Sequence, residues 1–206
     1  MVDAVYTVLG DLVGSRSLPD RAAVHERLAR ALDEVNSSLL PTEPFAPTVG
    51  DEYQGACDGL PDAVLAGLLV RLALLPEADV RCGIGHGPVT VYDDRRHPPL
   101  QDGPGWWTAR EAIEVIGAPR ESRRTWFVDD DLGHAALVNA FLVCRDQLVD
   151  RLNERGTRML RLALLGRTQK EIAAVEGVWP SAVSQQFSRG VGAVVQAQRL
   201  FASIPT

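Results

Sequence analysis

The sequence has few cysteines and no long apolar run. Its three cysteines, Cys57, Cys82 and Cys144, are an odd number without CxxC spacing. This pattern argues against a disulfide framework or a structural zinc site and favours reduced thiols. No apolar run reaches the roughly eighteen residues that cross a bilayer, and no basic flank precedes the short apolar stretch at the N-terminus, so no signal peptide is expected. We therefore expect a cytoplasmic protein with no membrane partner.

The charge of the chain is unevenly distributed over an ordinary globular composition. Of the 206 residues, 46% are hydrophobic and 23% are charged, which is enough apolar content for a packed core. Residues 151–206 contain eight basic and three acidic residues. Their charge of +5 leaves −11 for the first 150 residues, because the whole chain carries −6. A basic segment on an acidic body is expected when only one part of a chain meets nucleic-acid phosphate.

Residues 1–131 alternate between strand and helix patterns. Strands are expected at 4–10, 47–49, 53–57, 79–85 and 125–129, and helices at 20–38, 61–75 and 106–116. Residues 41–47 are expected to be a proline-rich connection, and Gly50-Asp51-Glu52 the turn of a hairpin. The order β-α-β-β-α-β-α-β predicts an α+β fold whose first domain, residues 1–131, is a ferredoxin-like α/β sandwich.

Strand patterns disappear after residue 131. Apolar residues recur at helical spacing through 132–152, which predicts a connecting helix, a dimer surface, or both. Residues 153–206 are expected to be a separate all-α domain. In that segment Thr168 and Glu171 form a T-x-x-E capping box, and Ile172, Ala173 and Val175 are expected on the buried side of the helix.

The C-terminal segment has the pattern of a helix-turn-helix that reads double-stranded DNA. Gly177 ends one helix, and Pro180 begins a second helix with small and amide side chains on its outer face. The run G-x-T-x-K-E-I-A-A-x-x-G-V-x-x-S-A-V-S-Q resembles region four of sigma factors and the DNA-binding domains of LuxR-type regulators. A plain helical subdomain is the alternative. The expected DNA contacts are Arg167, Thr168, Gln169, Lys170, Ser181, Ala182, Ser184, Gln185, Ser188 and Arg189.

Two Gly-Asp dipeptides predict a second site in the N-terminal domain. Asp11 and Asp51 each stand at a strand edge, where their carboxylates could converge on Mg²⁺ that bridges to the phosphates of a nucleotide. Glycines 83, 85 and 87 are expected to let the backbone approach that ligand. The other candidates for ligand or phosphate binding are Ser15, Arg16, Glu52 and His86. For Ser15, capping of a helix is an equal alternative.

The motifs GDLVGSR, TVGDEYQG and RCGIGHGPV resemble the class III nucleotide cyclase domain. The resemblance puts Asp11 and Asp51 on the two metal positions and Arg110 on the transition-state arginine. It also puts Trp106 where the family has its catalytic asparagine, and Pro47 where it has its purine-reading lysine. Because catalysis needs groups that act on developing charge, these two replacements favour a binding domain over an enzyme without deciding the question.

Together, GDxxxSR, GDEYQG, the IGxG strand, DGPxxxxAREA and the C-terminal pattern resemble the SatD family across nearly the whole chain. The resemblance implies a cyclase-like domain joined to a DNA-binding segment, with no assigned reaction. The leading hypothesis is a homodimeric transcriptional regulator that binds a nucleotide effector. The alternatives are a metal-dependent nucleotide cyclase or phosphohydrolase with a regulatory tail, and a protein-interaction module with two vestigial sites.

Overall fold

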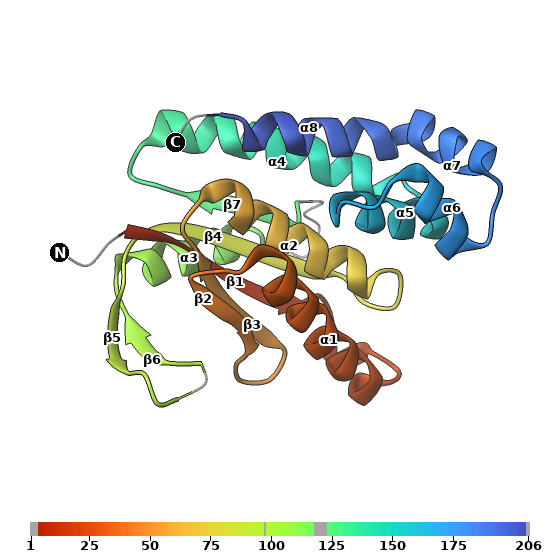
Figure 1. Cartoon of the computed structure of the whole chain (residues 1–206). Coiled ribbons are helices and arrows are strands. Elements are labelled where there is room, and N and C mark those ends of the chain that lie inside the picture. Colours follow the sequence, from red (N-terminus) through yellow and green to blue (C-terminus); the bar gives the residue numbers. More distant parts are fainter. Residues whose placement is uncertain (1–3, 97, 118–122, 205–206) are drawn as a thin grey trace.

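A five-stranded sheet lies at the centre of the computed structural model, which describes residues 4–96, 98–117 and 123–204 (Figure 1). The strands follow the order β2-β3-β1-β4-β7. β1 pairs antiparallel with both β3 and β4, β2 pairs antiparallel with β3, and β7 lies parallel to β4. Their bounds are β1 Ala4–Leu12, β2 Glu43–Pro47, β3 Glu52–Cys57, β4 Val80–Pro88 and β7 Thr125–Val128.

These five strands follow one another along the chain as predicted from the sequence, and the predicted last strand, 125–129, is β7 at one edge of the sheet. The prediction for residues 41–47 was wrong, because most of this proline-rich stretch is strand β2 and not a connection. Pro44 and Pro47 are tolerated there because β2 is an edge strand. No strand lies on its outer side, so a residue without a backbone N–H loses no hydrogen bond there.

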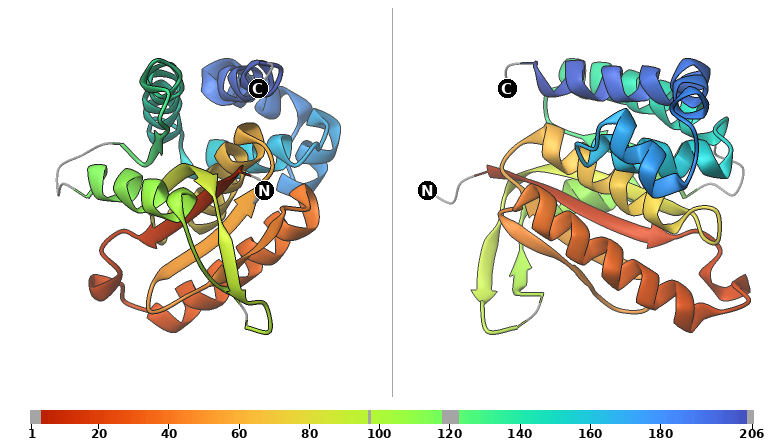
Figure 2. Two further views of the ribbon diagram at one scale, coloured as in Figure 1. Left: turned by 90° about the vertical axis from the view of Figure 1, so that its left-hand side faces the viewer. Right: turned by 45° about the vertical axis from the view of Figure 1, so that its right-hand side comes forward.

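Helices cover the two faces of the sheet unequally (Figure 2). One face packs against α1 (Arg21–Leu39), α2 (Leu60–Leu74) and α4 (Leu132–Asp150), and the other packs against α3 (Pro104–Val115) alone. A small hairpin of β5 (Thr90–Asp93) and β6 (Leu100–Asp102) stands beside α3. Within the described ranges, no helix is both long and apolar enough to cross a membrane.

The C-terminal helices pack directly on the sandwich through α2. They are α5 (Glu154–Leu164), α6 (Gln169–Glu176), α7 (Pro180–Gln186) and α8 (Gly192–Ala202), with a π-helical turn at Phe187–Val191 between the last two. Leu68 and Leu72 of α2 belong to the hydrophobic core of these helices, and Phe201 of α8 belongs to the core of the sheet. Nearly every residue of α2 is therefore buried, as expected for a helix that is apolar on all sides.

The apolar stripe predicted along 132–152 is only partly buried: Phe141, Leu148 and Leu152 are half-buried and pack against the hydrophobic cores. Leu137 and Cys144 are exposed, whereas the buried face of α4 carries the polar residues Asn139, Arg145 and Asp146. The side chain of Asn139 makes two hydrogen bonds with the backbone of Phe127 in β7. Its oxygen accepts from the Phe127 N–H, and its NH₂ group donates to the Phe127 carbonyl, at 2.8 Å each.

A buried ion-pair network holds α4 to the sheet and to α2. Asp146 is fully buried and accepts from the backbone N–H groups of Arg124 and Thr125 at 3.0 and 2.8 Å, and from the Arg145 guanidinium at 2.8 Å. Arg71 of α2 donates to Asp79 and Asp150 at 2.7 and 2.5 Å. Because removing one partner leaves a buried charge unpaired, loss of such a pair typically costs about 3–5 kcal/mol.

The glycines of β4 serve helix packing, which corrects the prediction that they admit a ligand. A Cβ at Gly83 would lie 2.4 Å from the carbonyl oxygen of Ala109, and one at Gly85 would lie 2.3 Å from the Ala109 nitrogen. Gly87, at φ +157°, likewise faces the backbone of Gly105. Helix α3 therefore occupies the space that these residues leave open.

This packing predicts a large cost for a single methyl group. Gly85→Ala should lower the free energy of unfolding by about 1–3 kcal/mol, because α3 must move away from β4. Gly133→Ala, within helix α4, is the matched control, since its Cβ would lie at an ordinary 3.4 Å from its nearest neighbour, Asp131. This variant should be as stable as the wild type or more stable by up to about 1 kcal/mol. Urea unfolding measures both variants, and equal stability of the two would contradict the packing described.

Candidate functional sites

The first candidate site lies on the half of the sheet that α3 leaves open. Side chains alternate between faces along a strand, and those of Leu9 and Asp11 on β1 point to the α3 side. Asp11 stands opposite Glu52 of β3 and opposite Arg81 of β4 in the two ladders. Three charged residues from three neighbouring strands thus meet at one end of the sheet.

Two arginines neutralise carboxylates at this site. Arg81 donates to Asp11 in a short ion pair. Arg110 of α3 makes a two-pronged contact with Glu52, at 3.1 and 3.2 Å between guanidinium nitrogens and carboxylate oxygens. The arrangement joins α3 to the end of β3 and leaves Asp51, in the turn before β3, as the third carboxylate.

The ionised form of Asp11 is disfavoured in the folded protein. Burial raises the pKa of Asp11 above its ordinary value of 3.8, the charges of Asp51 and Glu52 raise it further, and Arg81 opposes the shift. Asp51 is also held close through its backbone, since its carbonyl accepts from the N–H of Leu12 at 3.3 Å. A carboxyl group with a raised pKa in a charged cluster is a feature of binding and catalytic sites, though ion-pair networks can produce it too.

A cavity of about 370 Å³ continues from this cluster between α3, β1, β3 and the small hairpin. Leu9, Gln54, Gln101, Trp106 and Arg110 are among the residues that line it. Trp106 packs against Leu9 and is only 9% exposed, whereas Trp107 is 60% exposed, so the first is a core residue and the second a surface residue.

The side chains at this site are of the type that binds a divalent cation, but they would have to rearrange to bind one. Carboxylate oxygens are the ligands that Mg²⁺ prefers, and Asp11 and Asp51 provide them. Asp11, however, is already paired with Arg81, and no cluster of three or more metal-binding side chains occurs among residues 4–96, 98–117 and 123–204. A cation would have to displace Arg81 from Asp11 before both aspartates could bind it.

The structure does not gather every predicted site residue at this cluster. His86 lies five residues beyond Arg81 along β4, about 17 Å at the usual rise per residue. It stacks on Tyr6 with 4.5 Å between ring centroids and faces Asp129. Ser15 is buried in the short 3-10 turn Ser15–Ser17, with Arg16 exposed beside it. Ser15 does not cap α1, because Asp20 does so by accepting from Ala23.

Several polar residues of this face were not predicted from the sequence. Arg81 stands in the RCGIG motif, but only the strand register shows that it meets Asp11. Glu43 of β2 accepts from the side-chain amides of Gln54 and Gln101, at 3.3 and 2.6 Å. These three residues come from separate elements and form no motif along the chain.

The second candidate site is the outer face of α6 and α7. Thr168 and Glu171 form the predicted capping box, with the Thr168 N–H donating to Glu171 at 2.7 Å and the Glu171 N–H donating to Thr168 at 3.3 Å. Gly177 ends α6 in the left-handed region, at φ +63°, and α7 begins at Pro180. Of the ten predicted DNA contacts, all are exposed except Ala182, which is half-buried.

Two apolar side chains also lie on the outside of this segment. Val175 is 65% exposed, so its prediction as a buried residue was wrong; Ile172 and Ala173 alone face the core. Trp179, in the turn between the helices, is 82% exposed.

Comparison with known proteins gives one family. The model of the SatD family matches residues 5–193. Among solved structures, the chain is similar to the catalytic core of a rhodopsin-guanylyl cyclase with converted specificity in complex with ATPαS, at 20% identity and a TM-score of 0.44 over 55% of this chain and 73% of that one. A search of curated proteins finds no match.

The raised pKa of Asp11 predicts how stability responds to pH. The folded state holds this proton more tightly than the unfolded chain, so stability falls as pH rises from the unfolded value of 3.8 through the folded pKa. Asp11→Asn should therefore be at least as stable as the wild type at about pH 7, and any gain should vanish at about pH 3.

Urea unfolding at the two pH values measures this effect, with Asp33→Asn on the exposed face of α1 as the control. If Asp11→Asn lost more stability than Asp33→Asn near neutral pH, the pairing with Arg81 would outweigh the burial of Asp11.

Proposed function

This chain belongs to the SatD family, and we propose that it is a homodimeric DNA-binding transcriptional regulator. Its α/β domain binds a nucleotide or a related phosphorylated effector, and the outer face of α6 and α7 binds double-stranded DNA. The two activities are linked if the effector binds the DNA-competent arrangement with a different affinity.

The exposure of the predicted contacts on α6 and α7 is the observation that carries this proposal. Ser181, Ser184 and Gln185 are short or amide side chains on the outside of the second helix, and Ser188 is exposed in the turn that follows it. Short side chains let a helix backbone approach the floor of the major groove, and an amide can pair with both polar atoms of an adenine edge. The opposite side of the helix is closed by Val183, which is fully buried.

Basic residues flank this face. Arg167 and Lys170 are exposed at the start of α6, and Arg189 is exposed just beyond α7. Positive charge at the start of α6 and just beyond α7 suits contacts to the phosphates that flank the groove. The acidic character of the first 150 residues keeps the rest of the surface unattractive to DNA.

The dimer is part of the proposal because one such module buries little DNA surface. Proteins that read DNA in this way commonly pair two modules on half-sites about one helical turn apart.

We prefer effector binding over catalysis because of the side chains that lie on the open face of the sheet. Arg81 and Arg110 already neutralise Asp11 and Glu52. Trp106, at the position that resembles the catalytic asparagine of cyclases, packs against Leu9. Its indole N–H can donate a hydrogen bond but, unlike the amide of an asparagine, the side chain has no oxygen to accept one.

DNA binding should depend on the outer face of α7 and on salt. With a duplex selected from a random library, Gln185→Ala and Arg189→Ala should each weaken binding by about 1–3 kcal/mol where they touch bases. Affinity should also fall steeply as salt rises, because phosphate contacts release counterions. Fluorescence anisotropy across a salt series measures both effects.

Arg30→Ala on α1 is the matched control, since Arg30 is an exposed arginine remote from α7, and it should leave affinity unchanged. Affinity that did not vary with salt, or an equal effect of Arg30→Ala and Arg189→Ala, would exclude this face as the DNA-binding surface.

The nearness of Asp11, Asp51 and Glu52 favours a second candidate function, a metal-dependent nucleotide cyclase or phosphohydrolase.

If the site binds an effector without catalysis, nucleoside triphosphates with Mg²⁺ or Mn²⁺ should raise the melting temperature of the protein without turnover. Asp51→Asn should reduce that thermal shift, whereas Asp93→Asn on the small hairpin should not. Product formation that both Asp11→Asn and Asp51→Asn abolish would establish the enzyme and contradict the effector role.

A further inference from the structure

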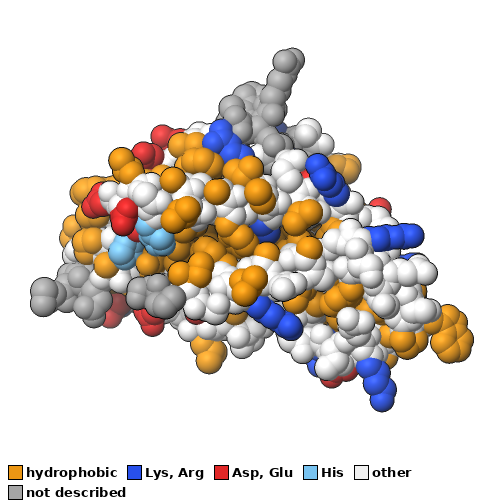
Figure 3. All heavy atoms as spheres, turned by 90° about the horizontal axis from the view of Figure 1, so that it is seen from above, with side chains coloured by type: hydrophobic (Ala, Val, Ile, Leu, Met, Phe, Trp, Pro, Cys, Tyr) orange, Lys and Arg blue, Asp and Glu red, His pale blue; other side chains and the backbone are white. Residues whose placement is uncertain are grey.

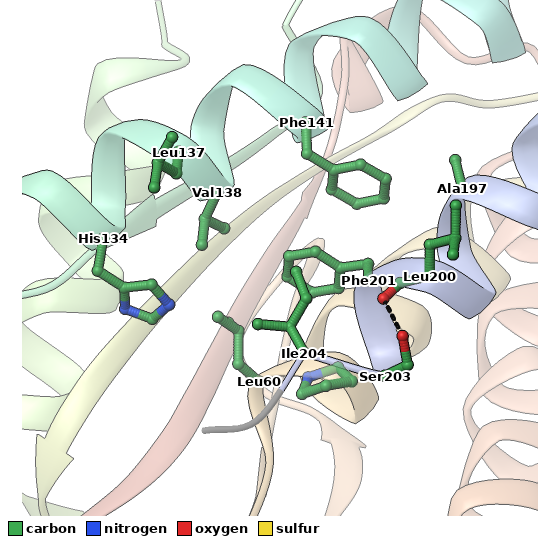
Figure 4. Close-up of a pocket in the computed structure, with 11 residues that line it drawn as sticks. Leu60, His134, Leu137, Val138, Phe141, Ala197, Leu200, Phe201, Ser203 and Ile204 are labelled. Atoms are coloured by element: carbon green, nitrogen blue, oxygen red, sulfur yellow. Dashed lines mark hydrogen bonds between the residues drawn. The ribbon is translucent and has the colours of Figure 1, made fainter.

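A hollow of about 610 Å³ opens between α4 and α8. Apolar side chains gather on this face of the molecule (Figure 3). The two helices are distant in sequence but lie side by side above the sheet (Figure 2). The N-terminal end of α2 closes the floor with Leu60, and Ser203 and Ile204, just after α8, close one end (Figure 4).

The lining of this hollow is almost entirely apolar. Val138 and Phe201 are buried at its base, and the rings of Phe141 and Phe201 stack with 4.6 Å between centroids and an interplanar angle of 5°. The rim stays open to solvent, where Leu137 is 76% exposed and Leu200 is 61% exposed. Large apolar side chains gathered around an open hollow are a feature of a binding surface.

We propose that this hollow is a binding site for a small, ring-containing apolar compound with one neutral hydrogen-bonding group. Its volume falls within the roughly 300–1,000 Å³ of small-molecule sites, which are typically apolar with a few polar groups. The stacked pair of phenylalanine rings presents flat apolar surface to a planar ligand, for which offset stacking is favourable.

Polar groups at the two ends define the ligand further. His134 borders one end, where its ring meets the edge of Phe127 at 5.7 Å and its Nδ1 lies 3.6 Å from a carboxylate oxygen of Asp129. The carboxylate makes this end unfavourable for an anion. At the other end the Ser203 hydroxyl donates to the carbonyl of Leu200 at 2.8 Å, which leaves its oxygen free to accept. A neutral donor suits the Ser203 end, and the carboxylate beside His134 disfavours a phosphorylated nucleotide.

This site is separate from the proposed function. No residue of its lining belongs to α6, to α7 or to the open face of the sheet. Ligand binding can therefore be measured without DNA and without a nucleotide, and its failure would leave the DNA-binding proposal untouched.

The experiment is a fluorescence titration of the full chain with N-phenyl-1-naphthylamine, a neutral aromatic probe with one N–H group. We expect saturable binding of one probe per chain. Ala197→Trp fills the hollow from α8 and should weaken binding at least tenfold. Ala140→Trp is the matched control, because Ala140 lies on the exposed side of α4 outside the lining and should leave binding unchanged.

Circular dichroism and thermal melting establish that each variant is folded. If Ala197→Trp does not fold, Leu137→Gln replaces it, since that exposed side chain can change without disturbing the core, and it should also weaken binding. Absence of saturable binding by the wild type, or equal affinity in both tryptophan variants, overturns the proposal. A wild-type dimer that binds no probe and becomes monomeric in Leu200→Gln would show that a second copy covers the hollow, which also overturns it.

Discussion

Helix α2 belongs to two hydrophobic cores at once, and the arrangement of the whole molecule depends on this. One side of the helix, with residues such as Val64 and Leu69, packs on the sheet; the other side, with Leu68 and Leu72, packs on α5 and its neighbours. A helix that buried only one stripe would leave the C-terminal segment free to move as an independent unit. Here the segment is fixed to the sandwich. Arg71 of α2 also bonds to Asp79, just before β4, and to Asp150 of α4, so that α2, α4 and the sheet are held together.

The two faces of the sheet are used differently for a related reason. Glycines on β4 bring α3 so close that it covers one part of its face completely. The neighbouring half, on β1 and β3, stays open and carries Asp11, Glu52 and Gln54. Charged groups collect where no helix excludes water, and the arginines that neutralise them come from the covered part. The candidate site is thus a consequence of where α3 stops.

Local patterns in the sequence were sufficient for most elements but not for their contacts. The capping box at Thr168 and Glu171 and the strand β1 depend on neighbours along the chain, and both were predicted correctly. Strand β2 was predicted at 47–49 but runs over Glu43–Pro47, because its prolines are tolerated only at an edge, and edges are a property of the assembled sheet. The apolar content of α2 could have indicated burial on all sides. By contrast, the stripe on α4 is only partly buried, because the polar residues Asn139, Arg145 and Asp146 occupy part of the buried face and find partners there.

The same limit applies to the sites. Asp11 and Asp51 were recognisable because each follows a glycine at a strand edge, whereas Arg81 could be placed opposite Asp11 only once the register of β1 and β4 was known. The ten candidate contacts on α6 and α7 come from one continuous stretch, so their exposure could be anticipated. Whether they bind DNA depends on a partner that no pattern within the chain contains.

Hydrogen–deuterium exchange of the full chain, with and without random-sequence duplex DNA at low salt, tests the central claim most directly. Binding through the proposed face predicts slower exchange in Gln169–Glu176 and Pro180–Gln186, with α1 and the β5–β6 hairpin unchanged. Protection confined to the sandwich, or no protection under conditions where DNA is retained by the protein, would contradict the assignment of this face as the DNA-binding surface.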